Sequence, residues 1–250
     1  MNDFYVGYLP STPPAIRRRV RLAVLIAALL AVAGAALFAA SQREFANSFF
    51  EYGKPAEFSG TLHLHPFPTL IMENPDALAG KSGAPYLLVA PGKFGADSIL
   101  TTMDGKRVRL RGTLIHRAEG HMIEIEPGSV SNVQDTSALA GQIQHLGLIT
   151  LTGEIVDTKC YLGVMNPGEG KVHRDCAARC LSGGIPPALA TSDFGGVSRL
   201  FLLLSKDGRP LAKRDFLQRV GQPVSIRGQA FETQGLYYVS TSVSGIQPLP

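Results

Sequence analysis

A single uninterrupted apolar run near the N-terminus dominates the pattern of hydrophobic and polar positions along the chain. Residues 22–40 read LAVLIAALLAVAGAALFAA, without one charged side chain. As a helix, this run is long enough to cross a hydrocarbon core about 30 Å thick. Its one weak helix former, Gly34, is a residue that membrane helices tolerate. The run therefore predicts a transmembrane helix over residues 22–40.

The residues on either side of this run predict its orientation. Arginines precede it at positions 17, 18, 19 and 21, whereas residues 41–44 are nearly neutral. By the positive-inside rule, residues 1–21 lie in the cytoplasm and residues 41–250 are periplasmic or extracellular, as in a single-pass protein of the inner (cytoplasmic) membrane. The alternative is a cleaved signal peptide ending near residues 39–41, although the apolar region of such peptides usually spans only about 7–15 residues.

Beyond the apolar run, short segments of alternating polar and apolar residues occur in two similar sets. Residues 105–112 (GKRVRLRG) resemble residues 221–228 (GQPVSIRG), and each segment is an alternating strand that ends in arginine and glycine. Each is followed, across a polar turn containing glycine, by a second alternating run, which is typical of a β-hairpin. We expect Arg111 and Arg227 to occupy equivalent positions, each before a glycine that marks the same bend.

The similarity extends upstream of the hairpins. Residues 60–64 match residues 153–157 as an opening strand, and residues 85–90 match residues 199–205. About five short strands in each ~90–100 residues, with glycine at the corners, indicate a small barrel. The predicted fold class is all-β with an N-terminal transmembrane helix: two tandem small OB-like β-barrels, the second carrying a short helix in a cysteine-containing loop. One continuous β-sandwich is the alternative.

These segments predict a domain organisation. We expect a first OB-like domain over residues 55–135, a linker over 136–147 and a second domain over 148–250; the polar, unpatterned residues 129–146 suit a linker with a short helix. With 45% hydrophobic and 18% charged residues among 250, the chain has apolar content for folded cores. The formal net charge is +4, and part of it comes from the arginine cluster before the apolar run. The rest of the chain is therefore not strongly basic. Nucleic acid is therefore not an expected partner.

All three cysteines fall in one loop of the second domain, residues 157–187. Residues 172–182 predict a short helix, which two glycines and two prolines then stop. His173, Cys176 and Cys180 lie at positions i, i+3 and i+7 of that helix, so they share one face. Cys160 comes at the end of the first strand, and we expect it to approach the same face.

Four interpretations of this cluster remain open. Cys160 can form a disulfide with Cys176 or Cys180, which leaves one cysteine over and needs no cofactor. Alternatively, the three cysteines and His173 can bind a metal ion, since this ligand set suits zinc and thiolates also suit copper(I) or iron–sulfur chemistry. A third possibility is a reactive thiol activated by neighbouring basic residues, namely Lys159, Lys171, Arg174 and Arg179. The fourth is three inert buried thiols.

A weaker metal-ligand pattern lies in the first domain. His63 and His65 alternate along the opening strand, so both point to one face, and His116 or His121 from the hairpin could complete a site. A solvated strand face is the simpler interpretation.

Function is only partly constrained by these patterns. Signatures of hydrolases, phosphate-binding loops and dinucleotide sites are missing from the sequence, which favours a non-enzymatic protein. We expect a membrane-anchored accessory protein that docks on a redox or transport complex in the membrane. A metal- or cofactor-handling or electron-transfer module using the cysteines and His173 is the alternative, and a thiol-redox enzyme is a third class.

Overall fold

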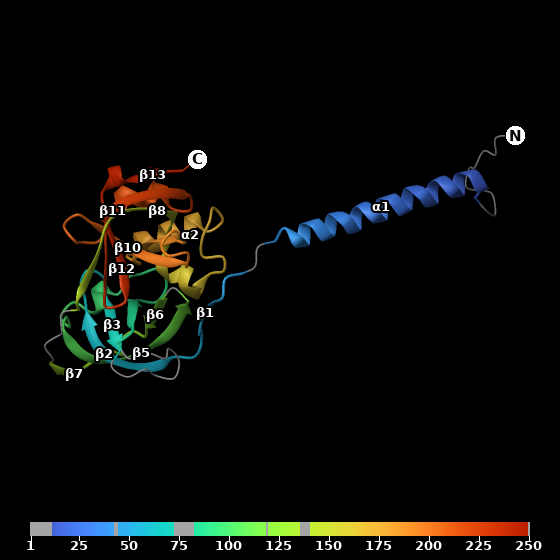
Figure 1. Ribbon diagram of the computed structural model, residues 1–250. Helices are drawn as coiled ribbons and strands as arrows, with labels where there is room; N and C mark the ends of the chain where they lie inside the picture. Colours follow the sequence, from blue (N-terminus) through green and yellow to red (C-terminus); the bar gives the residue numbers. More distant parts are fainter. Residues whose placement is uncertain (1–11, 43–44, 73–82, 119, 136–140, 250) are drawn as a thin grey trace. The chain divides into compact units, whose positions relative to one another are not determined.

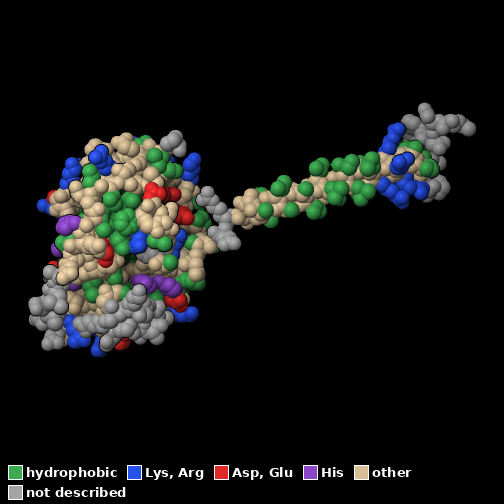
Figure 2. Space-filling view, viewed as in Figure 1, with side chains coloured by type: hydrophobic (Ala, Val, Ile, Leu, Met, Phe, Trp, Pro, Cys, Tyr) green, Lys and Arg blue, Asp and Glu red, His purple; other side chains and the backbone are tan. Residues whose placement is uncertain are grey.

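The computed structural model describes residues 12–42, 45–72, 83–118, 120–135 and 141–249, which form two compact units, Met1–Phe45 and Ala46–Pro250. The first unit contains one helix, α1 (Pro14–Ala40), none of whose residues is buried. Apolar side chains surround α1 along its length and basic side chains gather at its N-terminal end (Figure 2). This helix is long and apolar enough to cross a membrane or to act as a signal sequence. It begins eight residues before the predicted span because proline suits a first helical position and arginine is a good helix former.

The second unit consists mainly of β-structure and contains two closed five-stranded mixed β-barrels (Figure 1). In the first barrel the strands close in the order first, second, third, fifth, fourth, and only the third and fifth are parallel. These strands are β2 (Ala56–His63), β3 (Thr69–Met72), β4 (Pro85–Val89), β5 (Lys106–Arg117) and β6 (Gly120–Ile125). Two short strands, β1 (Ser48–Phe50) and β7 (Ser131–Asp135), pair with β5 outside this ring. A single 3-10 turn, η1 (Asp97–Ile99), lies between β4 and β5.

The second barrel repeats this order, again with its third and fifth strands parallel. Its strands are β8 (Ile143–Asp157), β9 (Pro187–Thr191), β10 (Arg199–Ser205), β11 (Pro223–Thr233) and β12 (Leu236–Thr241). A short strand, β13 (Ile246–Pro248), also pairs with β11. The connections contain five short helical segments: η2 (Cys160–Val164), α2 (Arg174–Ser182), α3 (Lys213–Phe216), η3 (Leu217–Arg219) and η4 (Val243–Gly245).

The two barrels match strand for strand in register. Val108 lies opposite Gly60 in the first barrel, and Val224 lies opposite Gly153 in the second. The strands of the two hairpins also pair in the same register. Arg111 and Arg227 therefore occupy equivalent positions, as the repeat predicts.

Glycine is required at the same places in both barrels because another strand passes too close for a side chain. A Cβ atom at Gly60 would overlap the carbonyl oxygen of Ile71, and one at Gly153 would overlap that of Ala190. Gly112 and Gly228 likewise lie against the backbone of the following strand. The repeated glycines are therefore part of the barrel geometry.

Some elements differ from the sequence-based expectation. The second strand of each barrel, β3 and β9, is missing from the predicted order; both are short and mostly buried, so they lack the alternation that marks a half-exposed strand. The expected helix within 129–146 is wrong where the structure describes this range, because β7 and the start of β8 lie there. β8 begins at Ile143, inside the expected linker 136–147, while residues 136–140 lie outside the described residues.

Three clusters of buried side chains hold this unit together. One fills the first barrel and one fills the second, as with Leu110 and Phe201. The third joins the two barrels, because Leu87 and Met122 of the first share it with Leu202 of the second. Cys160 and Cys180 belong to this shared cluster, so the cysteine loop is part of the packing between the barrels.

Candidate thiol site

Cys160 is positioned by the end of the first strand of the second barrel. The chain leaves β8 at Asp157 and turns into the single helical turn η2, which begins at Cys160. The backbone N–H of Cys160 donates to Asp157 Oδ1 at 2.8 Å, which fixes the start of this turn. The Cys160 side chain is 3% exposed, so the turn places its sulfur in the interior.

Cys176 and Cys180 lie one helical turn apart on α2, within the predicted helix. The helix stops as its glycines predict. The Gly183 N–H donates to the Arg179 carbonyl at 3.0 Å, and Gly184 adopts a φ of +100°, in the region that favours glycine. The Ile185 N–H then returns to the Cys180 carbonyl at 3.1 Å, so the last turn is closed around Cys180.

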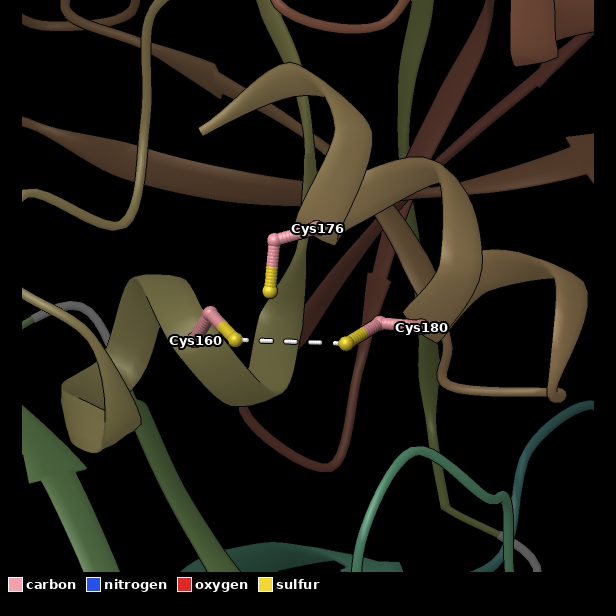
Figure 3. Close-up of side chains that lie close together, drawn as sticks. All are labelled: Cys160, Cys176 and Cys180. Atoms are coloured by element: carbon pink, nitrogen blue, oxygen red, sulfur yellow. Dashed lines mark hydrogen bonds between the residues drawn. The ribbon is translucent and has the colours of Figure 1, made fainter. Parts of the chain in front are cut away.

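Three sulfur atoms from these two elements converge on one point (Figure 3). All three lie within 4.8 Å of one another, and the Cys160 and Cys180 sulfurs are 3.9 Å apart. All three are free thiols; Cys160 and Cys180 are buried, whereas Cys176 is partly exposed. Three thiolates bound to one ion at about 2.3 Å would have sulfur–sulfur distances of about 3.8–4.0 Å, so the group suits a shared metal ion.

His173 is turned toward a different partner. Its Nε2 lies 3.0 Å from Asp157 Oδ2, and both side chains are buried. Asp157, Cys160 and His173 form a second group of ligand atoms within 4.8 Å, which shares only Cys160 with the three-sulfur group. The structure thus brings the three expected sulfurs together. His173, the expected fourth ligand, does not belong to this three-sulfur group. The reason is the Asp157 carboxylate, which holds the imidazole just before α2 begins.

A lysine from the first barrel completes the site. Lys93, in the loop after β4, places its ammonium 2.9 Å from the Cys176 sulfur and 3.6 Å from the Cys180 sulfur. Nothing in the sequence pattern marks Lys93, because it is 83 positions from Cys176 and belongs to the other barrel. Sequence reasoning therefore misses Lys93 as a residue of the candidate site, and the packing of the two barrels identifies it.

Lys159 holds the loop that carries Lys93. Its side chain is 2% exposed, and its ammonium donates to the carbonyls of Ala90 at 2.9 Å and Gly92 at 2.6 Å, besides pairing with Glu124. The sequence suggests Lys159 as a direct activator of a thiol. The structure instead gives it a positioning role, because its ammonium binds groups of the first barrel.

The electrostatics of the site favour a thiolate at Cys180. A hydrogen bond from the Cys160 thiol, assisted by the Lys93 ammonium, lowers the pKa of Cys180 to about 7, against the opposing effects of burial and Asp157. Donation of that hydrogen bond and burial raise the pKa of Cys160. The hydrogen bond to Cys176 raises the pKa of Lys93, so this lysine stays cationic. Near neutral pH Cys180 is therefore the thiol that ionises most readily beside the Lys93 ammonium, in preference to Cys160.

The histidines of the first barrel are arranged differently. His63 ends β2, His65 is exposed in the following loop, and neither belongs to a group of ligand atoms in the described part of the chain. His116 and His121 lie opposite each other on β5 and β6, with ring centroids 6.4 Å apart. Burial, assisted by His116, lowers the pKa of His121, and burial lowers that of His63. The thiol cluster thus has the stronger metal-ligand geometry.

No protein-family profile, curated protein or solved structure matches this chain.

Proposed function

We propose that this protein is a membrane-anchored metal-handling module whose Cys160, Cys176 and Cys180 bind one thiophilic metal ion. The observation that carries the proposal is the convergence of three sulfurs from two separate elements, with Cys160 and Cys180 3.9 Å apart. A hydrophobic core does not need such convergence, since thiols serve there as small apolar groups that pack independently.

Copper(I) is the metal that these ligands favour. Thiolates select soft ions, among which copper(I), zinc and iron–sulfur clusters are the usual choices. Structural zinc almost always takes four protein ligands. Among the described residues, no fourth cysteine, histidine or carboxylate lies within 4.8 Å of all three sulfurs. Three sulfurs alone match the lower coordination number that copper(I) accepts.

The protein offsets part of the charge that the loaded site would carry. Three thiolates and one monovalent ion leave a net charge of minus two, which is costly in a mostly buried site. Lys93 supplies a compensating cation next to two of the sulfurs, and its donors can bond to thiolates that also bind a metal. Cys176 is partly exposed, so we expect an ion to reach the cluster through this sulfur.

The surrounding architecture fits a module that works at a membrane. Both barrels close in the order first, second, third, fifth, fourth with the last strand parallel to the third, which supports an OB-like assignment with domains near residues 55–135 and 148–250. We assign α1 as a retained anchor with residues 1–21 in the cytoplasm and residues 41–250 outside it, since arginines precede the apolar run. Its partner would be a redox or transport complex in the same membrane.

A specific observation favours thiol redox chemistry as the second candidate. Cys180 has a pKa of about 7 and faces the Cys160 thiol, so it is the nucleophile that an exchange reaction needs. A protein disulfide would accept the electrons, with Cys160 resolving the mixed disulfide and leaving a Cys160–Cys180 bond.

The experiment uses the full chain, reduced and anaerobic in detergent, titrated with copper(I) against a chromophoric copper(I) chelator. The proposal predicts one ion per chain, and loss of tight binding in Cys160→Ser, Cys176→Ser and Cys180→Ser. Met165→Leu is the matched control, because Met165 is 46% exposed and this substitution removes a sulfur that lies outside the cluster.

Two results would contradict the metal assignment. One is failure of the wild-type chain to compete with the chelator for copper(I). The other is equal binding by wild type and the three cysteine variants. If the protein purified from membranes instead contains a Cys160–Cys180 disulfide and no metal, the redox candidate replaces the metal-handling one.

A further inference from the structure

A cleft of about 590 Å³ lies where the two barrels meet, separate from the thiol sulfurs. Aliphatic side chains from both barrels contribute to its walls: Leu87 from β4, Leu162 from the turn after Cys160, and Leu236 from the start of β12. The volume is that of a pocket for a small organic molecule. An apolar group can therefore be accommodated between the barrels.

One cation faces this cleft without an anionic partner. Arg199, the first residue of β10, has its guanidinium carbon 4.7 Å from the centre of the Tyr237 ring and 5.6 Å from that of Phe194. Its Nε atom is buried and has no hydrogen-bond partner, and no acidic side chain pairs with it in the described part of the chain. The aromatic rings hold the guanidinium in place but do not accept its N–H groups in the way that a carboxylate does.

The histidine of the cleft does not supply this partner. His121 also lines the cleft, and burial together with His116 lowers its pKa, which favours the neutral imidazole and supplies no negative charge. The cleft thus combines a positive charge, an N–H donor without a partner and several aliphatic side chains.

We propose that this cleft binds a small organic anion with an apolar body and one carboxylate, the carboxylate pairing with Arg199. A planar guanidinium matches the two oxygens of a carboxylate. The apolar body then fills the space between Leu87, Leu162 and Leu236. This site is independent of the metal proposal, because none of its charged contacts involves a cysteine.

The test uses the full chain in phosphatidylcholine nanodiscs and fluorine NMR of two soluble probes. The first probe is para-trifluoromethyl-phenylacetate, and the second is its neutral primary amide, which has the same shape without the charge. Empty nanodiscs correct for partition into lipid. We expect the carboxylate to bind about tenfold more tightly than the amide, as a charge-assisted hydrogen bond implies.

Three variants locate the site. Arg199→Met keeps the apolar stem and should reduce carboxylate binding about tenfold while leaving amide binding within about twofold. Arg199→Lys keeps the charge and should retain part of the preference. Arg209→Met is the matched control, because Arg209 is 83% exposed and does not line the cleft, so it should bind like wild type.

The proposal is overturned if neither probe binds the wild-type chain, if the two probes bind equally, or if Arg199→Met keeps the preference for the carboxylate. Should Arg199→Met fail to fold, the comparison of the two probes on the wild-type chain and on Arg199→Lys decides the question. Copper(I) binding measured on the same samples is expected to be unchanged, so failure here and failure of the metal proposal are distinguishable.

Discussion

The two barrels share their strand order and register, yet they differ sharply in the loop between their first and second strands. In the first barrel this loop covers residues 64–68, whereas in the second it covers residues 158–186 and contains all three cysteines. The long loop adds two helical segments without shifting the strands that flank it. A repeated scaffold thus tolerates an insertion in one copy, and this insertion carries the candidate thiol site.

The first barrel, which lacks the insertion, also contributes residues to the thiol site. The loop after β4 brings Lys93 to the sulfurs, and the Gly95 N–H donates to the Gly183 carbonyl at 3.1 Å, beside the end of α2. A Cβ atom at Gly183 would overlap the carbonyl oxygen of Lys93. The second barrel alone therefore lacks the cation, and each barrel depends on the other for the site.

The largest expected effect concerns what the barrels have in common. Gly60→Ala and Gly153→Ala each force a Cβ atom into a neighbouring backbone carbonyl, so each should destabilise the protein by about 3 kcal/mol or more. Thermal unfolding of the full chain measures this. Gly120→Ala is the control, since its Cβ would meet Leu162 at an ordinary 3.7 Å. A clear difference between the two barrel variants would show that the scaffold is not equivalent in the two copies.

The next effect concerns the connection between the barrels. Lys159→Met removes a buried cation and leaves Glu124 and two carbonyls without their donor, at a cost of about 2–3 kcal/mol. Lys54→Met removes an exposed ion pair with Glu51 and should cost less than about 1 kcal/mol. Equal losses for the two variants, measured by chemical denaturation, would contradict the positioning role of Lys159.

A smaller effect distinguishes the two ligand groups of the long loop. His173→Asn breaks the buried contact with Asp157 and should lower the free energy of unfolding by about 1–2 kcal/mol. Because the three sulfurs do not include this imidazole, the copper(I) stoichiometry should stay at one per chain. Loss of the metal in this variant, with the fold retained, would return His173 to the ligand set.

The smallest effect tests which lysine acts on the thiols. The thiolate absorbance of Cys180 should appear as the pH rises through about 7. Lys93→Gln removes a nearby positive charge, so it should shift this titration to higher pH. Lys171→Gln, an exposed residue of the same loop as the cysteines, should leave it unchanged. The opposite pattern would mean that the site is contained within the second barrel.

The sequence by itself determined the features that depend on local pattern. The apolar run and its arginines predict α1, alternation with glycine corners predicts the matched hairpins, and the spacing of Cys176 and Cys180 predicts one helix face. These features were accessible because helix and strand periodicity act over a few residues.

Only the tertiary structure decided what depends on contacts between distant residues. Strands β3 and β9 are mostly buried and carry no alternation, so their pairing identifies them. His173 precedes α2 instead of lying on its predicted face, and the carboxylate of Asp157, 16 positions away, contacts its imidazole. Lys93 meets Cys176 because two folded barrels pack together, and no local periodicity encodes a contact across 83 positions. The charge beside the thiols is therefore a property of the packed pair of barrels.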